Sequence, residues 1–294
     1  MKKLKILAPL FTVVPAIIAA LGVEQANLHR PAPAAAPTTR SSAATQFAAQ
    51  SFTPGSYLGF DTFAYPGDAA MRAWRLSDSP YSWVGFYLPA PCHKDDSWSG
   101  TRQRLTDMGW GMAVIYVGQQ AWDQIPGHGG RSGVGSSDCS TANLTRARGT
   151  QDADDATAQT AAQGFPRGTT IFLDVERVEH LPQALRDYYT AWVKGVLADG
   201  RYVPGIYTHT WNADSVHEDV KAVFTAAGIQ QEPPFWVANT HDFSPDKVPS
   251  EVGHTFADVW QGMIDVVKKV NGVRLPVDVN VAAAPSPSAV YAAE

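Results

Sequence analysis

Four acidic residues lie at the ends of apolar segments, or within one, that otherwise have the composition of buried β-strands. Asp61 ends the first of these segments, Asp174 and Glu176 end another, and Asp278 interrupts the last. A charged group among apolar residues is costly unless it is paired or faces a polar cavity. We therefore expect the four carboxyl groups to meet in one cavity, where such groups can exchange protons with a bound molecule.

Asp174 and Glu176 are two positions apart, a spacing that places both side chains on the same face of a strand, with Cα atoms about 6.6–6.8 Å apart. Two carboxyl groups this close cannot both ionise freely, so the pKa of one should rise and suit a general acid. Glycoside hydrolysis uses such a pair. A structural interpretation stays open, in which the two acids cap a helix and Glu176 pairs with Arg177 or Arg201.

Aromatic and amide residues late in the same kind of segment are candidate substrate-binding residues. Flat rings suit the apolar faces of sugar rings, and we place Tyr207, Trp236 and Tyr116 in this group. Gln261 and Asn280 are candidates to bind hydroxyl or acetamido groups, and they could equally be polar strand-end residues whose hydrogen bonds are satisfied within the protein. Core packing is the alternative for every aromatic residue, and we favour it for Trp83 and Trp260.

Several other chemistries are excluded by the absence of their motifs. The histidines nearest the predicted cavity show no H-E-x-x-H or short H-x-H spacing, so we predict neither a metal site nor a cofactor. There is no G-x-S-x-G elbow, Walker loop or dinucleotide-binding fingerprint. Nor is there a basic patch, which argues against a nucleic-acid partner. The histidines concerned are His93, His128, His209 and His241.

The first residues have the pattern of an export signal. Lys2, Lys3 and Lys5 precede an apolar stretch that reaches Val23, and small residues at 20–22 suit cleavage after Gly22. An uncleaved membrane anchor is the alternative for 1–22. Residues 23–50 are rich in Ala, Pro, Ser and Thr, which predicts a flexible spacer.

The charge and the cysteines agree with an exported protein. The chain has 23 Lys plus Arg against 28 Asp plus Glu, and removing 1–22 takes away three Lys and no acids. In an exported protein, two cysteines most often form a disulfide, so we predict one between Cys92 and Cys139. A metal site made by these two thiols is the weaker alternative, because no C-x-x-C half-site is present.

The region 51–284 alternates short β-branched segments with amphipathic ones, as in a barrel of parallel strands joined by helices. Residues 285–294 are predicted to be a flexible tail. The pattern predicts an α/β fold, a TIM-like (β/α) barrel with eight strands, five helices and an irregular last third. The strands are expected at 57–61, 83–88, 111–117, 170–176, 203–208, 235–239, 257–261 and 277–281, and the helices at 68–76, 101–108, 152–163, 182–199 and 215–227. A loop rich in Gly and Ser, at 118–149, is far longer than usual, and loops of this length tend to be functional.

The segments that carry these residues resemble those of family 25 glycoside hydrolases, which are lysozymes that cut peptidoglycan between N-acetylmuramic acid and N-acetylglucosamine. They occur in the same order: Leu58-Gly-Phe-Asp61, Phe172-Leu-Asp-Val-Glu176, Gly205-Ile-Tyr207, Phe235-Trp-Val-Ala238, Trp260-Gln261 and Val277-Asp-Val-Asn280. Tyr116-Val-Gly-Gln-Gln120 and Gly164-Phe-Pro166 are closer to the exported, actinobacterial glycoside-hydrolase-like domains. The resemblance spans nearly the whole of 51–284 and implies a barrel of eight strands and five helices.

The resemblance also implies roles for the candidate residues. Glu176 would be the general acid, and Asp174 would orient or stabilise the acetamido group of the substrate. Asp61 and Asp278 would complete an acidic floor, with Tyr207 and Gln261 lining the site. Two departures from the lysozymes stand out: Thr-Phe-Ala-Tyr-Pro follows Asp61 where they show Ser and then Gln, and the long loop at 118–149 is foreign to them.

The leading hypothesis is therefore a secreted or envelope-associated glycoside hydrolase, resembling the muramidases, that acts on peptidoglycan or another envelope glycan without a metal. We expect a monomer with no membrane partner beyond the N-terminal segment. A catalytically inactive barrel that binds wall carbohydrate is the second hypothesis. An envelope scaffold for protein partners is the third, and it would expose an apolar patch elsewhere.

Overall fold

A closed barrel of eight strands forms the centre of the computed structural model, which describes residues 55–122 and 138–289. The predicted export segment at 1–22 and the spacer at 23–50 lie outside the described residues. Together with five α-helices in the described part of the chain, the barrel confirms the predicted fold class. The strands are β1 (Tyr57–Asp61), β2 (Trp83–Tyr87), β3 (Gly111–Tyr116), β4 (Thr170–Val175), β5 (Val203–His209), β6 (Phe235–Ala238), β7 (Val259–Val270) and β8 (Val273–Ala282).

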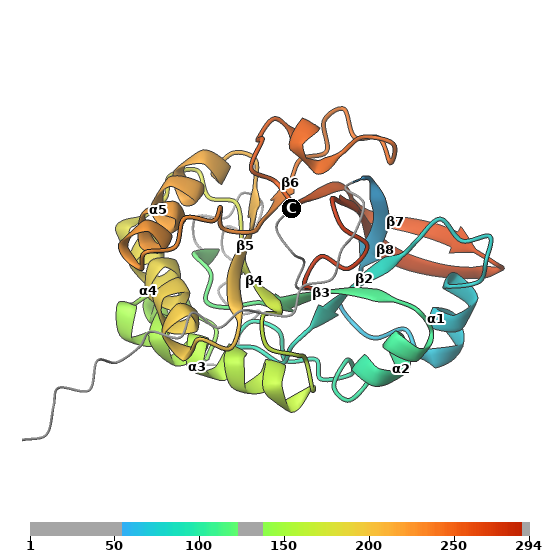
Figure 1. Cartoon of the computed structure of the whole chain (residues 1–294), viewed down its shortest axis with the longest axis horizontal. Helices are drawn as coiled ribbons and strands as arrows, with labels where there is room; N and C mark the ends of the chain where they lie inside the picture. The colour runs from blue at the N-terminus through green and yellow to red at the C-terminus, as the bar shows by residue number, and fades with distance from the viewer. Residues whose placement is uncertain (1–54, 123–137, 290–294) are drawn as a thin grey trace, which may run out of the picture. The chain divides into compact units, whose positions relative to one another are not determined.

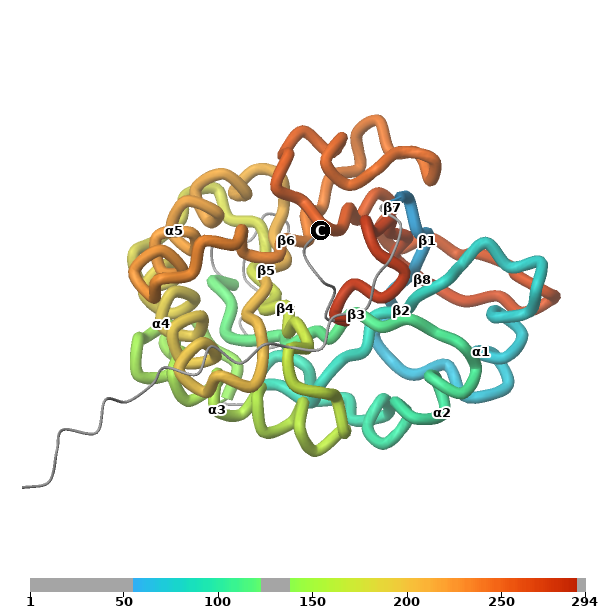
Figure 2. Tube along the Cα trace, viewed as in Figure 1, coloured from blue at the N-terminus to red at the C-terminus, as the bar shows by residue number. Residues whose placement is uncertain are grey.

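The helices cover only part of the barrel. Figure 1 shows α3, α4 and α5 along one side of the ring of strands, with α1 and α2 along another. Around β6 the chain instead forms a long loop, at 239–258, which the tube in Figure 2 follows in orange. The last third is therefore irregular, as the sequence predicted. The helices are α1 (Asp68–Trp74), α2 (Arg102–Asp107), α3 (Arg146–Ala162), α4 (Gln183–Asp199) and α5 (Ala213–Ala226), and the loop holds the short 3₁₀ helix η3 (Pro249–Val252).

Side chains alternate along each strand between the inside of the barrel and the helix layer. Ile115, Phe172 and Trp236 belong to the inner apolar cluster together with Trp83, which is fully buried. The larger cluster lies between the strands and the helices, and it contains Trp260. The carboxyl ends of the strands, where the inner cluster stops, are left to polar side chains.

The strands β7 and β8 are much longer than the sequence analysis predicted. The two strands are antiparallel, and their pairing continues as far as Val270 of β7 and Val273 of β8. They extend past α1 as a two-stranded hairpin (Figure 1). Asn271 and Gly272 form its turn with positive φ angles of 48° and 85°, the conformation that an Asn-Gly pair favours in a two-residue hairpin. The Asn-Gly pair was the available sequence signal for this hairpin.

Helix α3 begins at Arg146, six residues before the predicted start at 152. The side chain of Thr145 accepts a hydrogen bond from the Arg148 N–H and caps the helix. Gly149, which the sequence analysis assigned to the loop, lies inside α3. The position needs glycine because a Cβ there would be 2.3 Å from the Tyr188 carbonyl oxygen of α4. The loop predicted at 118–149 therefore ends before Arg146. Its central part, 123–137, lies outside the described residues.

The segment after β8 is attached to the amino-terminal end of the barrel. The carbonyl oxygen of Ser288 accepts a hydrogen bond from the Thr170 N–H, and its hydroxyl accepts one from the Val114 N–H. Gly111 allows this approach, since a Cβ there would lie 1.9 Å from the Pro285 carbonyl oxygen. The part of the predicted tail that the structure describes, up to residue 289, is therefore held in place by hydrogen bonds.

None of the helices in the described part of the chain has the length and apolar character that crossing a bilayer demands.

Candidate active site

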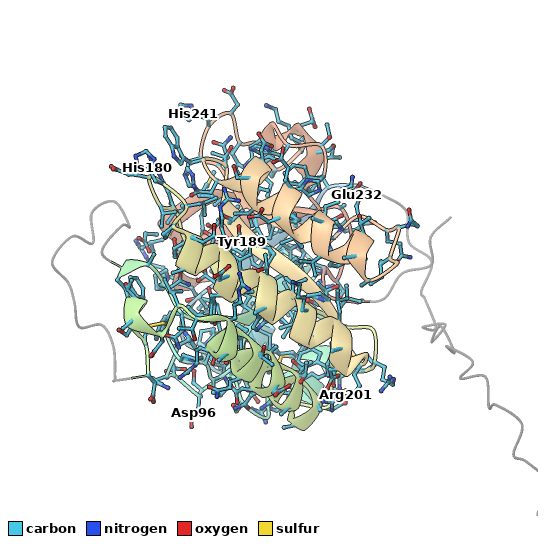
Figure 3. All side chains as sticks on the ribbon, turned by 90° about the vertical axis from the view of Figure 1, so that its left-hand side faces the viewer. Asp96, His180, Tyr189, Arg201, Glu232 and His241 are labelled. Atoms are coloured by element: carbon cyan, nitrogen blue, oxygen red, sulfur yellow. A yellow bond between two sulfur atoms is a disulfide. The ribbon has the colours of Figure 1, made fainter. Side chains whose placement is uncertain are left out.

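The polar side chains meet in a pocket at the carboxyl end of the barrel. Figure 3 shows this end in a side view, where Asp96, His180 and His241 follow strands β2, β4 and β6 and lie opposite Arg201 and Glu232. Catalytic groups of (β/α) barrels come from this end. The pocket has a volume of about 80 Å³, and its lining residues are Asp61, Tyr87, Ile115, Asp174, Glu176, Tyr207, Trp236, Gln261 and Asp278.

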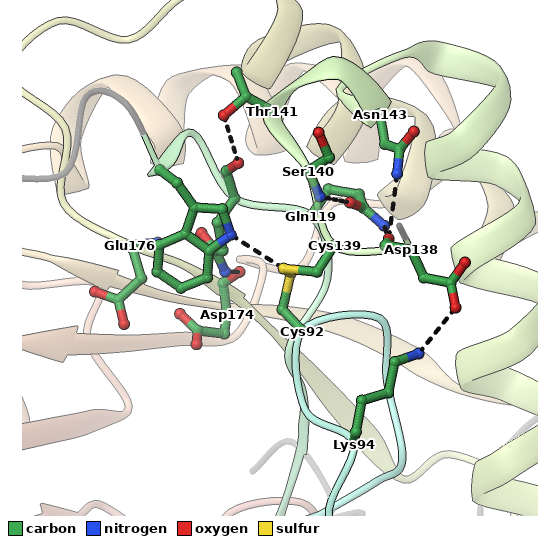
Figure 4. Close-up of a disulfide and its surroundings, with 12 residues drawn as sticks. Cys92, Lys94, Gln119, Asp138, Cys139, Ser140, Thr141, Asn143, Asp174 and Glu176 are labelled. Atoms are coloured by element: carbon green, nitrogen blue, oxygen red, sulfur yellow. Dashed lines mark hydrogen bonds and ion pairs between the residues drawn. A yellow bond between two sulfur atoms is a disulfide. The ribbon is translucent and has the colours of Figure 1, made fainter. Parts of the chain in front are cut away.

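Asp174 and Glu176 both line the pocket, as their spacing predicted. Figure 4 shows the two side chains projecting in the same direction near the Cys92–Cys139 disulfide. Gln120, which the sequence analysis did not single out, fixes the end of the strand. Its amide nitrogen donates to the Asp174 carbonyl oxygen at 2.9 Å, and its amide oxygen accepts from the Glu176 N–H at 3.2 Å. These two hydrogen bonds fix the backbone of Asp174 and Glu176, and the backbone in turn positions the two carboxyl groups.

One oxygen of the Asp174 carboxyl group, Oδ1, is buried without a hydrogen-bond partner among the described residues. Burial raises the pKa of Asp174 well above its ordinary value, and the negative charges of Glu176 and Asp61 raise it further. Asp174 therefore keeps its proton at pH values where an exposed aspartate has lost it.

Asp61 forms the buried floor of the pocket. Its Oδ1 accepts a hydrogen bond from the Tyr87 hydroxyl at 2.7 Å, and its Oδ2 accepts from the amides of Asn280 at 2.9 Å and Gln261 at 3.2 Å. Burial raises the pKa of Asp61, and these three hydrogen bonds oppose the rise. With both oxygens occupied, Asp61 positions its neighbours and has no oxygen left without a partner.

Gln261 connects three of the predicted site residues. Its amide nitrogen donates to Asp61 and, at 3.2 Å, to Asp278, while its amide oxygen accepts from the Tyr207 hydroxyl at 2.8 Å. The other oxygen of Asp278 accepts from the Asp265 N–H. Burial and the charge of Asp61 raise the pKa of Asp278 to about 7. Asp278 therefore binds a proton near neutral pH, and it lies beside Asp61 and Asp174, whose pKa values are also raised by burial.

Trp236 and Tyr207 form the aromatic wall, with ring centroids 5.6 Å apart in an edge-to-face arrangement. The Trp236 indole donates to the Asn280 amide oxygen at 3.1 Å, which orients the Asn280 amide nitrogen toward Asp61. Asn280 is fully buried. Its side chain supports the pocket floor through these two contacts.

Tyr116 does not line the pocket, and the prediction that placed it among the substrate-binding residues needs correction. Side chains alternate along β3, so Ile115 points inward and Tyr116 points outward to the helices. The Tyr116 hydroxyl donates to Asp155 of α3 at 2.9 Å, and its ring stacks on Trp192 of α4. The sequence analysis also passed over Tyr87, whose hydroxyl reaches the pocket floor. The sequence signal that separates these tyrosines is the alternation of side chains between the two faces of a strand.

The predicted disulfide is present. Cys92, after β2, is bonded to Cys139, which lies before α3, across 47 positions of sequence.

Within 55–122 and 138–289, no three His, Cys, Asp or Glu residues are grouped closely enough to hold a metal ion.

Comparisons with known proteins agree with this architecture. The structure resembles that of an uncharacterised protein of B. stearothermophilus, with a TM-score of 0.51 and 18% identity over 77% of this chain and 95% of that one. It also resembles the spore cortex lytic enzyme SleM of Clostridium perfringens, with a TM-score of 0.52 and 17% identity over 82% of this chain and 71% of that one. At these identities the likeness shows the fold. A comparison with curated proteins found no match.

The family itself is shown by sequence. The model of the Rv2525c-like, glycoside hydrolase-like domain matches residues 72–282. This range includes strands β2 to β8 and three of the four carboxyl groups, whereas β1 and its Asp61 precede it. The resemblance inferred from the sequence motifs is confirmed. The chain belongs to the Rv2525c-like glycoside hydrolase-like domain family.

Proposed function

We propose that this protein is a secreted glycosidase that hydrolyses peptidoglycan or another cell-envelope glycan with the carboxyl groups of Asp174 and Glu176. One observation carries the proposal: both groups line a single pocket at the carboxyl end of the barrel, and the buried Asp174 oxygen lacks a partner among the described residues. The glycoside hydrolase-like family of the chain supports it. The disulfide and the export pattern at 1–22 support secretion.

The size of the pocket indicates which part of a sugar it receives. With a volume of about 80 Å³, the pocket is too small for a whole sugar ring with its substituents. That space suits one substituent, such as an acetamido group, with the sugar ring lying above it at the mouth. The acetamido N–H would then donate to the carboxyl group of Asp174.

Such a contact redistributes the proton that two neighbouring carboxyl groups share. A hydrogen bond donated to Asp174 favours its ionised form, which leaves the proton on Glu176. Glu176 then donates this proton to the glycosidic oxygen as the C1–O bond breaks. The acetamido carbonyl oxygen bonds to C1, and ionised Asp174 stabilises the positive charge on the acetamido nitrogen. Water afterwards attacks C1 and breaks its bond to the acetamido oxygen, so that the acetamido group is restored. The attacking water returns a proton to Glu176.

Binding of wall carbohydrate without hydrolysis is the second candidate function. The pocket is far smaller than the 300–1,000 Å³ of most ligand sites. Both Asp61 oxygens are also engaged inside the protein. A pocket that admits only a substituent could serve recognition alone.

The first test compares the reducing ends that the full chain releases from peptidoglycan with those released by Glu176→Gln. We expect the loss of a general acid to lower release at least about a hundredfold. Glu179→Gln is the matched control, since Glu179 is exposed in the same loop and lies outside the pocket lining. Equal release by Glu176→Gln and the unmodified protein would refute the catalytic assignment. Binding without release by either would favour the second candidate.

A further inference from the structure

Trp211 is the most exposed large apolar side chain of the described residues, at 63%. It follows β5, the strand whose Tyr207 lines the carboxyl pocket and pairs in register with Asp174 of β4. The ring therefore lies at the mouth of the barrel, in the sector of the two proposed catalytic groups. The exposed indole offers a flat apolar face on which a sugar ring can stack.

Arg177 lies against this ring. Its guanidinium carbon is 5.1 Å from the centre of the Trp211 ring, an arrangement that attracts the cation to the aromatic face. Its Nε atom is buried and has no hydrogen-bond partner, and within the described ranges the side chain forms no ion pair. Arg177 directly follows Glu176. A positive charge that forms no ion pair in the described part of the chain thus lies next to the acidic pocket.

The two loops that carry these side chains are clamped together. Asn212 is buried, and its amide accepts from the Val178 N–H at 3.0 Å while donating to the Val178 carbonyl oxygen at 3.1 Å. The Trp211 N–H donates to Nδ1 of His209 at 3.0 Å. Its indole N–H reaches the Glu179 carbonyl oxygen at 3.4 Å. The Arg177–Trp211 pair is therefore a preformed surface, which lowers the ordering cost of binding.

The chemistry of this pair fits a sugar that carries a carboxylate. The acidic pocket repels an anion, so a negative substituent must lie outside it. A guanidinium matches the planar, two-oxygen geometry of a carboxylate, and the indole supplies the stacking face. The carboxylate could belong to a lactyl ether on the ring or to a uronic acid ring.

We propose that Arg177 and Trp211 form a subsite for a carboxylate-bearing pyranose next to the carboxyl pocket, an inference that rests on the proposed function. Arg177 selects the negative charge, whereas Trp211 binds the ring whether or not it is charged. The subsite makes acidic glycans the preferred substrate class.

The test measures dissociation constants by calorimetry for the full chain carrying Glu176→Gln, so that nothing is cleaved. Three probes are compared: a peptide-free tetrasaccharide of alternating N-acetylglucosamine and N-acetylmuramic acid, an oligomer of four uronic acids, and neutral chitotetraose. Adding Arg177→Gln should weaken binding of an acidic probe about tenfold and leave chitotetraose unchanged. The acidic probe that responds identifies the source of the carboxylate. Trp211→Ala should weaken that probe and chitotetraose alike.

Arg75→Gln is the matched control, because Arg75 also stacks on a tryptophan, Trp110, but lies before β2 at the other end of the barrel. It should change none of the three constants. Arg177→Lys keeps the charge and should retain part of the preference, and the unfolding midpoints of all variants confirm folding. Equal weakening of acidic and neutral probes by Arg177→Gln, or weakening of neither, would overturn the subsite alone. Binding of no probe by the Glu176→Gln protein would overturn the proposed function together with it.

Discussion

The carboxyl pocket depends at the residue scale on amide side chains that hold charged groups in a buried place. Asn280 joins Trp236 to Asp61, and Gln261 joins Tyr207 to Asp61 and Asp278. Each amide both donates and accepts, so neither can be replaced by a carboxyl group without loss of a donor. The floor of the pocket is set by these amides as much as by the acids.

Asn280→Asp tests this dependence. The new carboxyl group could still accept from the Trp236 indole, but it would face Asp61 without the amide donor. We expect the free energy of unfolding at pH 7 to fall by about 3 kcal/mol, the cost of a buried charge left unpaired. Urea unfolding at pH 4, where the new group is protonated, should show a much smaller loss. The same loss at both pH values would show that charge is not the cause.

The raised pKa of Asp278 makes stability depend on pH. Its value of about 7 in the folded protein exceeds the ordinary 3.8, so the folded state binds this proton more tightly than the unfolded chain does. The stabilisation is complete below about pH 4 and is lost as the pH rises through about 7. The unfolding free energy should therefore decline across this range, at up to about 1.4 kcal/mol per pH unit for one proton.

Asp278→Asn should make that decline shallower, because an amide can still accept from the Asp265 N–H but does not titrate. Part of the decline should remain, since burial also raises the pKa of Asp258, to about 6, and that of Asp174. Urea unfolding at several pH values measures both slopes. A slope unchanged by the substitution would contradict the raised pKa of Asp278.

The sequence predicts a site residue correctly only where it shows which face of a strand the side chain occupies. Asp174 and Glu176 were found because acids at a strand end are rare and their spacing fixes a shared face. Tyr116 was misplaced because an aromatic residue fits either face of β3, and only the position of Ile115 inside the barrel decides. Gln120 was missed because it acts through backbone contacts, which carry no residue-type signal.

At the scale of elements, apolar patterns predicted the strands of the barrel well and the irregular parts poorly. The buried halves of β7 and β8 were recognised, but their outer halves were not, because exposed residues interrupt the apolar pattern. The start of α3 was missed because Gly149 looks like a loop residue, whereas close packing on α4 requires it. Such requirements come from the neighbouring element and not from the segment itself.

The segment after β8 has a testable structural role. Ending the chain at residue 284 would remove the acceptors of three backbone N–H groups, those of Met112, Val114 and Thr170. At about 1 kcal/mol for each hydrogen bond, we expect the free energy of unfolding to fall by about 3 kcal/mol. A chain ending at 289, which keeps all three bonds, is the control for urea unfolding. Equal stability of the two truncated chains would contradict the role.

For the whole molecule, alternation of strands and helices predicted the barrel, since few folds accommodate that order. The pocket follows from the barrel, because closure brings β1, β4, β7 and β8 to one end although Asp61 and Asp278 are far apart in sequence. The sequence alone could not supply the size of the pocket, which depends on how the amides and rings pack. That size is what points to a substituent of a sugar and not to a whole ring.

The most direct measurement is a crystal structure of the Glu176→Gln protein with a tetrasaccharide of N-acetylglucosamine and N-acetylmuramic acid. The account predicts an acetamido group inside the pocket, with its N–H donating to the carboxyl group of Asp174, and a glycosidic oxygen next to residue 176. A sugar bound elsewhere on the barrel, with the pocket holding only water, would contradict it.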